Sequence, residues 1–176
     1  YQRILNAADE PGNWLTYNGG YSSQRYSRLD QLTPENADQP QLQWTLQNQV
    51  FGAWQSNPII VDGIMYVTER PNSVMALDAI TGRVFWKYRH VPADNALVCC
   101  GANNRGVAVL GDKVFMGTLD ARLVALDRIN GQPLWNVEVG DVSLAYSVTM
   151  APLAVKDKII VGVGGGEYGI RGYEVA

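Results

Sequence analysis

Apolar and polar residues alternate along several short stretches of the chain, and two of these stretches belong to a repeat. The segment Asp62 to Trp86 (DGIMYVTERPNSVMALDAITGRVFW) aligns without a gap on Gly111 to Trp135 (GDKVFMGTLDARLVALDRINGQPLW), 49 residues further on. Alternation with β-branched residues predicts strands, and Gly beside Asp or Asn predicts turns. Each copy therefore predicts a strand, a short polar link, a second strand, an Asp-x-x-x-Gly turn and a Trp-bearing strand. The strands expected before the turns are Ile64–Thr68, Val74–Leu77, Val114–Thr118 and Leu123–Leu126, and the turns are Asp78–Gly82 and Asp127–Gly131.

The repeat extends in both directions beyond these two copies. A third copy begins at Lys156 (KDKIIVGVGGGEYGIRGYEVA), where YEVA takes the place of SVMA and RLVA. Trp44 precedes Trp86 by 42 residues, as if it closed an earlier unit. A period of about 40–50 residues with four strands per unit is typical of a β-propeller. Core tryptophans of a β-sandwich are the alternative, but they would give no reason for the constant spacing.

The sequence therefore predicts an all-β propeller of four-stranded blades, in which each Trp docks between neighbouring sheets. We expect a lead-in segment at about 1–40 and repeats at about 41–90, 91–139 and 140–176, the last incomplete. Roughly three blades would leave open sheet edges, which invite aggregation. The 176 residues are thus expected to form the first part of a longer propeller domain.

Composition excludes several classes of partner. The chain is 47% hydrophobic and 18% charged with a net charge of −3, which is ordinary for a globular protein and gives no reason to expect nucleic acid or an anionic membrane. No apolar run approaches the roughly 18 residues of a membrane span. The N-terminus also lacks the basic region and apolar stretch of a signal peptide.

The only two cysteines, Cys99 and Cys100, are adjacent. Neighbouring Cα atoms are about 3.8 Å apart, which is closer than the roughly 4.4–6.8 Å usual for a disulfide. A bond between them would span no loop and would therefore remove little entropy from the unfolded chain. From the residues alone the pair is either a tight disulfide ring or two free thiols, and stability is not the reason for it.

Several motifs together resemble one enzyme family. The run CCGANNRG, the two repeat endings ALDAITGRVFW and ALDRINGQPLW, the run GGGEYGIRGY and the lead-in NWLTYNGGYSSQRYSRLDQLTPEN are similar to the quinoprotein alcohol and methanol dehydrogenases. The resemblance implies a periplasmic enzyme that holds pyrroloquinoline quinone (PQQ) in an eight-bladed ring, of which this chain would be about a third. It implies hydride transfer from a small alcohol to the quinone, with electrons passing to cytochrome c or a similar acceptor.

The same resemblance implies roles for particular residues. Cys99 and Cys100 would form a disulfide against one face of PQQ, and Arg105 and the Thr149 hydroxyl would bond its oxygens. Glu167 would be a ligand to a cation, Ca²⁺ or a lanthanide, beside the quinone. The remaining candidate cofactor contacts are Gly164, Gly165, Gly166 and Gln55, the last at a position where relatives often carry Glu.

The sequence also leaves rival interpretations open. Arg105 could be a solvated surface charge and Glu167 part of a flexible turn. A non-catalytic propeller scaffold for protein–protein interaction would explain the repeats, although not the adjacent cysteines, and a sugar dehydrogenase of the same superfamily is disfavoured by that pair. The family's general-base aspartate has no counterpart here, so we assign no catalytic role to Asp94 or Asp120 and expect the segment alone to be inactive. His90, the single histidine, is expected to have a solvated or capping role and not to be a ligand.

Overall fold

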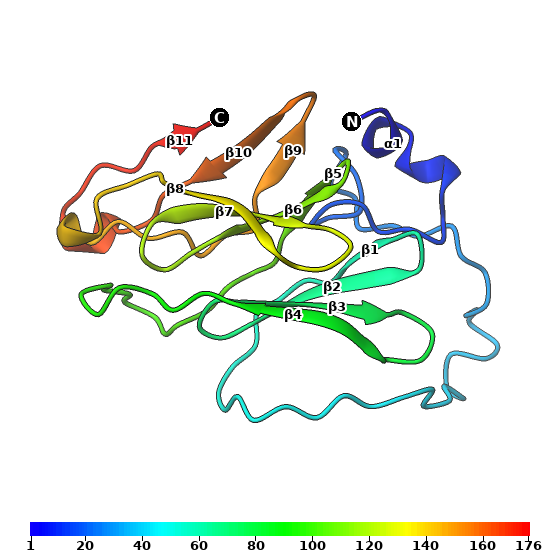
Figure 1. The fold of residues 1–176 in the computed structure, drawn as a ribbon. Coiled ribbons are helices and arrows are strands. Elements are labelled where there is room, and N and C mark those ends of the chain that lie inside the picture. Colours follow the sequence, from blue (N-terminus) through cyan, green and yellow to red (C-terminus); the bar gives the residue numbers. More distant parts are fainter.

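Three antiparallel sheets lie one above another in the computed structural model, which describes residues 1–176 (Figure 1). The first sheet consists of β1 (Ile59–Val61), β2 (Ile64–Glu69), β3 (Ser73–Asp78) and β4 (Val84–Arg89). The second consists of β5 (Ala108–Leu110), β6 (Lys113–Gly117), β7 (Arg122–Asp127) and β8 (Pro133–Glu138). The third contains β9 (Leu153–Val155), β10 (Lys158–Gly162) and β11 (Glu174–Val175). Within each sheet the strands follow the order of the chain, as in the blades of a propeller.

The strands predicted from the repeat are confirmed to within one residue at each end. The two complete sheets share even their irregularities, because the pairing shifts between Ala76 and Leu77 in one and between Ala125 and Leu126 in the other. Such a bulge increases the local twist of a strand pair. The 49-residue repeat of the sequence is therefore a structural repeat in detail.

Tryptophans join neighbouring sheets as the repeat predicts. The Nε1 atom of Trp86, on β4, donates to the carbonyl of Arg128 at 3.0 Å, in the turn between β7 and β8. A Cβ on Gly131 of that turn would lie 2.5 Å from Cε3 of Trp86, so the indole packs directly on the glycine. Trp44 makes the equivalent contact with the first sheet, where its Nε1 donates to Ala79 at 3.2 Å. Trp44 itself lies in an extended segment outside the named strands.

Asp residues at the start of each turn fix its shape. Oδ1 of Asp78 accepts from the amides of Ile80 and Thr81, both at 2.9 Å. Oδ1 of Asp127 accepts from Ile129 and Asn130 at 2.8 and 3.1 Å. These Asx turns present the glycine on which the Trp packs.

The links between β2 and β3 and between β6 and β7 are polar in sequence but buried in the structure. Glu69, the last residue of β2 before the first link, is 2% exposed, and its carboxylate lies against Nζ of Lys87. Asp120, in the link between β6 and β7, is 7% exposed. Such burial requires a partner for each charge, and these partners lie on other elements.

The lead-in segment is anchored to two edge strands, β1 and β9. It begins with the short helices α1 (Gln2–Leu5) and η1 (Ala7–Asp9), and Trp14 then pairs with Ile60 of β1 through two backbone hydrogen bonds of 2.8 and 3.0 Å. Further on, the hydroxyl of Tyr21 donates to the carbonyl of Ala154 on β9. Residues from about 30 to 55 then run along the outer side of the β1–β4 sheet (Figure 1).

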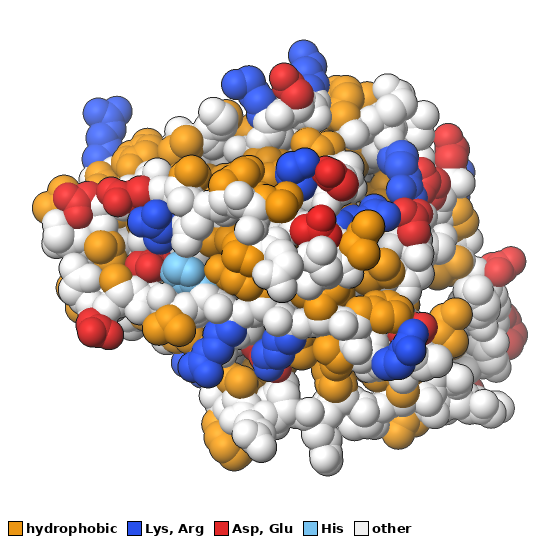
Figure 2. All heavy atoms as spheres, viewed as in Figure 1, with side chains coloured by type: hydrophobic (Ala, Val, Ile, Leu, Met, Phe, Trp, Pro, Cys, Tyr) orange, Lys and Arg blue, Asp and Glu red, His pale blue; other side chains and the backbone are white.

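The surface carries no dominant charge on the face seen in Figure 2, where acidic and basic side chains are scattered among apolar ones. No helix in the structure has the length and apolar character needed to cross a bilayer.

Candidate functional site

A hollow of about 200 Å³ lies where the loops before β5 and β9 meet the segment after β10. Of the nine residues predicted for the site, it brings seven together: Cys99, Cys100, Arg105, Thr149, Gly164, Gly165 and Glu167. Val98, Gly101, Asn103 and Ser147 complete its lining. Gly166 and Gln55 do not line it.

Backbone hydrogen bonds align the loops that surround the hollow. The amide of Arg105 donates to the carbonyl of Thr149 at 3.1 Å, and the amide of Asn57 donates to the carbonyl of Arg105 at 3.0 Å. Ser147 and Gly164 exchange two bonds of 3.1 and 2.7 Å. The main chain thus connects the approaches to β1, β5 and β9, one after the other.

Arg105 and Thr149 are also paired through their side chains. Nη1 of Arg105 donates to Oγ1 of Thr149 at 2.9 Å and to its carbonyl at 3.3 Å. These bonds orient the half-buried guanidinium, yet they engage only one of its three nitrogens. The Nε and Nη2 donors are left for an acidic ligand, to which the planar fork of an arginine is well suited.

Two asparagines that the sequence analysis did not single out hold the loop between the cysteines and β5. Asn104 is buried, its Nδ2 donates to Gly117 at 2.8 Å, and its Oδ1 accepts from the amide of Gly106 at 3.0 Å. Asn103 is buried as well, and its Nδ2 donates to the carbonyl of Cys100 at 3.1 Å. The run Asn-Asn-Arg-Gly was a signal for a tight turn, but the distant backbone partners could not be read from it.

Cys99 and Cys100 are joined by a disulfide, with Cα atoms 3.8 Å apart. Both residues are exposed on the rim of the hollow. The pair therefore presents sulfur to whatever occupies the hollow and is not part of the apolar core.

The glycine-rich segment has different requirements at each position. Gly165 has φ +128, and a Cβ there would lie 2.4 Å from the carbonyl oxygen of Ala145, so only glycine fits. A Cβ on Gly164 would make only ordinary contacts with Ser147, and one on Gly166 would meet nothing within 4 Å. Gly166 begins the short helix η3 (Gly166–Tyr168).

Glu167, within η3, is exposed and is the only carboxylate that lines the hollow. No group of three or more His, Cys, Asp or Glu side chains is arranged to hold a metal ion anywhere in the chain. A cation at the hollow would therefore need most of its ligands from other groups, because Ca²⁺ takes about 6–8 oxygens.

His90 corrects an expectation from the sequence. Its side chain is only 10% exposed, and its Nε2 lies 2.9 and 3.0 Å from the two carboxylate oxygens of Asp120, so it is not a solvated residue. Thr118 Oγ1 and the amide of Ala93 also donate to this carboxylate, at 2.6 and 3.1 Å. Burial alone would raise the pKa of Asp120, but the bonds from His90, Thr118 and Ala93 outweigh it and lower the pKa to about 2. The partner lies 30 residues away, and no local pattern announces it.

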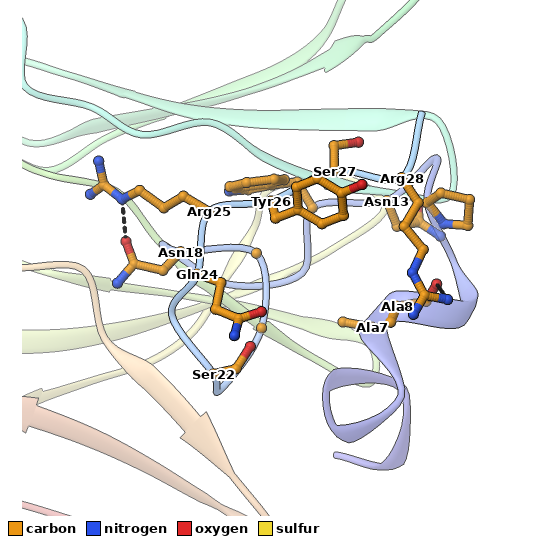
Figure 3. Close-up of a pocket in the computed structure, with 14 residues that line it drawn as sticks. Ala7, Ala8, Asn13, Asn18, Ser22, Gln24, Arg25, Tyr26, Ser27 and Arg28 are labelled. Carbon is orange, nitrogen blue, oxygen red and sulfur yellow. Dashed lines mark hydrogen bonds between the residues drawn. The ribbon is translucent and has the colours of Figure 1, made fainter. Parts of the chain in front are cut away.

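A second hollow, of about 300 Å³, lies within the lead-in segment (Figure 3). Figure 3 shows the Arg25 side chain directed toward Asn18, to which its Nε donates at 2.7 Å. Nη1 of Arg28 donates to the carbonyl of Ala8 at 3.4 Å. Both guanidinium groups are thus engaged within the chain, and none of the predicted site residues lines this hollow.

Residues 14–168 match the family described as "Glucose/ethanol/alcohol dehydrogenase, beta-propeller domain", whose short name is PQQ. The chain belongs to this family of PQQ dehydrogenases. The recognition made from the motifs and the propeller fold are both confirmed.

Individual members of the PQQ dehydrogenase family are similar to this chain over nearly its whole length. The chain is 43% identical to the quinohemoprotein alcohol dehydrogenase ADH-IIG of Pseudomonas putida, over 99% of this chain and 25% of that protein. It is 38% identical to the lanthanide-dependent methanol dehydrogenase of Methylacidiphilum fumariolicum, over 96% of this chain and 28% of that protein. A solved europium-containing methanol dehydrogenase superposes with a TM-score of 0.93 at 37% identity, over 99% of this chain and 31% of that one. The chain thus spans about a quarter of the length of the curated relatives that it matches.

The residues around the hollow fit the cofactor of the PQQ dehydrogenases. PQQ is flat, aromatic and tricarboxylic, and the hollow offers an exposed sulfur pair, the free donors of Arg105 and a threonine hydroxyl. Asn103 adds a buried Oδ1 atom with no hydrogen-bond partner in the chain, next to the disulfide. The positive fork of Arg105 and the Thr149 hydroxyl suit an anionic group of the ligand, whereas Asn103 Oδ1, an acceptor, suits a ligand N–H. Glu167 is the one carboxylate that lines the hollow.

Proposed function

We propose that this chain forms part of the cofactor pocket of a PQQ-dependent alcohol dehydrogenase. The observation that carries the proposal is that seven of the nine residues to which the family resemblance gives a role, from Cys99 to Glu167, line one hollow. Membership of the PQQ dehydrogenase family and the alcohol and methanol dehydrogenases among its relatives support it.

Each part of the hollow has a proposed task. The Cys99–Cys100 disulfide provides a rigid, polarizable platform for one face of the cofactor, because a tight ring cannot reach the quinone as a free thiolate would. Arg105, oriented by Thr149, pairs with carboxylate or quinone oxygens of the cofactor. Gly164, Gly165 and Gly166 let the backbone approach the cofactor edge. When bound, PQQ supplies a two-electron acceptor for the hydride of an alcohol.

Glu167 is proposed to give one carboxylate to a cation beside the cofactor. Its exposure at the hollow supports this role, as does the lanthanide named in one relative. Carboxylate oxygen suits a hard cation such as Ca²⁺ or a lanthanide, and the cation would polarise a quinone carbonyl. Gln55, which lies on an exposed segment outside the hollow, is proposed as a further contact at the cofactor edge.

The rest of the activity is proposed for the complete protein. We propose an eight-bladed ring in which residues 1–40 lead in and repeats at about 41–90, 91–139 and 140–176 contribute three blades. A later blade would carry the aspartate base that takes the alcohol proton. Electrons would pass to cytochrome c or a similar acceptor in the periplasm, an oxidising compartment that suits the disulfide. Residues 1–176 alone would show no turnover.

Cofactor binding by the complete protein tests the proposal. PQQ is added to cofactor-free protein with Ca²⁺ or La³⁺, and binding is followed by quenching of tryptophan fluorescence and by dye reduction with an alcohol. Wild type should bind, and Arg105→Met should bind at least about 10-fold more weakly, because a charge-assisted bond is worth about 1.5–3 kcal/mol. Failure of the complete protein to bind PQQ with either cation would reject the enzyme and favour the non-catalytic scaffold. Mass measurement before and after reduction should show a gain of two hydrogens from the Cys99–Cys100 bond.

A further inference from the structure

Arg70 connects two loops that come from different parts of the chain. It follows β2 directly, and its Nε donates to the carbonyl of Ala102 at 3.2 Å, on the loop that carries the disulfide. Its Nη1 makes a longer bond of 3.5 Å to the carbonyl of Phe51, on the segment that leads to Gln55. One guanidinium therefore contacts both the disulfide loop and the Gln55 segment.

The guanidinium occupies a slot between two glycines of positive φ. Gly52 has φ +113, and a Cβ there would lie 1.9 Å from Nη1 of Arg70, so no side chain fits while the arginine is in place. Gly101 has φ +92, and a Cβ there would touch Nη2 at 3.4 Å. Gly52 therefore lies directly against the guanidinium, and a side chain at position 52 would displace the far end of Arg70.

The two neighbouring basic side chains, Lys87 and Arg89, do not connect two loops as Arg70 does. Lys87 and Arg89 border the same outer surface of the first sheet as Arg70. Lys87 is paired with the buried carboxylate of Glu69. Arg89 is exposed and has no side-chain hydrogen bond, which makes it a matched control for the loss of a cation.

Arg70 does not line the hollow, so any effect on the site must pass through the two loops. The disulfide loop, residues 94–103, is held at its two flanks. Before it the amide of Ala93 donates to Asp120, and after it Asn104 bonds Gly117 and Thr68. Within the loop Asn103 bonds the carbonyl of Cys100, and Arg70 is the only distant residue that bonds the loop itself. Without the bond from Arg70, the loop would sample more positions, and a ligand would have to order it on binding.

We propose that Arg70 is a positioning residue that fixes the disulfide loop relative to the Gln55 segment and so shapes the cofactor hollow. The inference rests on the proposed function where it concerns PQQ. Its first consequence, the restraint of the disulfide loop, does not depend on PQQ. Loss of the restraint should raise the access of reductant to the Cys99–Cys100 bond and weaken ligand binding.

The test uses the complete, cofactor-free protein with five single variants and one double variant. Arg70→Met removes the guanidinium group. Gly52→Ala displaces the guanidinium but leaves Arg70 in the sequence. Arg89→Met controls for lost charge, and Gly63→Ala controls for strain at positive φ, because Gly63 has φ +78 and nothing within 4 Å of a Cβ. The readouts are the rate of Cys99–Cys100 reduction by a phosphine, the Kd for PQQ, and the melting temperature.

Arg70→Met and Gly52→Ala should each speed reduction and raise the Kd for PQQ about 10-fold, the loss expected when one ordered hydrogen-bonded contact worth about 1.4 kcal/mol is removed. Their double variant should match either single variant, because both remove the same contact. Arg70→Lys, which keeps the charge but not the fork, should not restore wild-type reduction.

The outcomes separate the two proposals. If Arg70→Met and Gly52→Ala behave like Arg89→Met and Gly63→Ala in both readouts, Arg70 is not a positioning residue. If they speed reduction while wild type binds no PQQ, the restraint stands and the proposed function fails. If Arg70→Met does not fold, Gly52→Ala and its control decide the question.

Discussion

Nε2 of His90 lies 2.9 Å from Oδ1 of Asp120, at the boundary between the first and second sheets. The same carboxylate accepts a hydrogen bond from the amide of Ala93. Asp120 therefore binds both ends of residues 90–93, the first four residues after β4 on the way to Cys99. The buried pair of His90 and Asp120 therefore lies at the start of the segment between β4 and β5 that carries the disulfide. The low pKa of Asp120, about 2, means that this group favours the folded state in its charged form.

Stability should depend on the charge of Asp120 in a defined pH range. Because the folded-state pKa of about 2 is below the ordinary 3.8, the stabilisation is complete above about pH 4 and is lost as the pH falls toward 2. Asp120→Asn should therefore lower the free energy of unfolding at pH 7 by about 2 kcal/mol, at about 1.4 kcal/mol per pKa unit. Urea unfolding of the complete protein from pH 7 to pH 2.5 measures this, with the exposed Asp157→Asn as control. A difference from wild type that stays constant over the range would contradict the assignment.

Thr149 should affect ligand binding more than folding. Thr149→Val keeps the shape of the side chain but removes the acceptor for Nη1 of Arg105, while Thr149→Ser retains it. The loss of one such bond is worth about 0.5–1.5 kcal/mol, so the Kd for PQQ should rise about 3- to 10-fold. Titration of the cofactor-free protein compares the two variants. Equal affinities for the valine and serine variants would show that the hydroxyl does not orient Arg105 for the ligand.

The disulfide should contribute little to stability. Because Cys99 and Cys100 are adjacent, their bond closes no loop of chain. The double variant Cys99→Ser/Cys100→Ser should therefore lower the free energy of unfolding by about 1 kcal/mol or less, well under the roughly 2–4 kcal/mol of an ordinary disulfide. Denaturant unfolding measures the stability, and PQQ binding on the same samples should weaken. A large loss of stability with unchanged PQQ affinity would reverse the assignment of the pair from ligand platform to structural bond.

The contact between Trp86 and Gly131 should be intolerant of a single methyl group. Gly131→Ala would place Cβ 2.5 Å from the indole, whereas Gly111→Ala, at a similar positive φ, meets nothing within 4 Å. Both substitutions cost about 1–2 kcal/mol for the left-handed backbone, and Gly131→Ala should cost a further 1–3 kcal/mol or so through overpacking. Thermal unfolding of the two variants side by side provides the comparison. Equal melting temperatures would mean that the tryptophan does not dock on this turn.

The fold was predictable because its signals are local and repeated. Alternation around Ile64 and Val114 and the turns at Gly82 and Gly131 each act within a few residues, and their constant spacing implies identical units. The buried polar residues were harder to predict, because Glu69, at the end of β2, is buried only when a partner from another strand covers it.

The site was predictable only in part, and for a physical reason. The motifs implied nine residues for a ligand site, and seven of them line one hollow, but Gly166 and Gln55 lie outside it. The groups that support these residues were missed: Arg70 contacts Ala102, and His90 contacts Asp120, each about 30 residues away along the chain. Such pairings follow from the stacking of the sheets, which no short motif encodes.

Backbone hydrogen bonds run from Asn57 to Arg105 and from Arg105 to Thr149. The main chain therefore aligns these loops, and the side chains are left to contact a ligand. Since main-chain atoms set the alignment of successive sheets, the side chains at these positions can be exchanged without altering that alignment. A substitution of the exposed Gln55, two residues before Asn57, would then change the chemistry offered to a ligand and not the framework that offers it. Such a framework is open to new specificities by substitution alone.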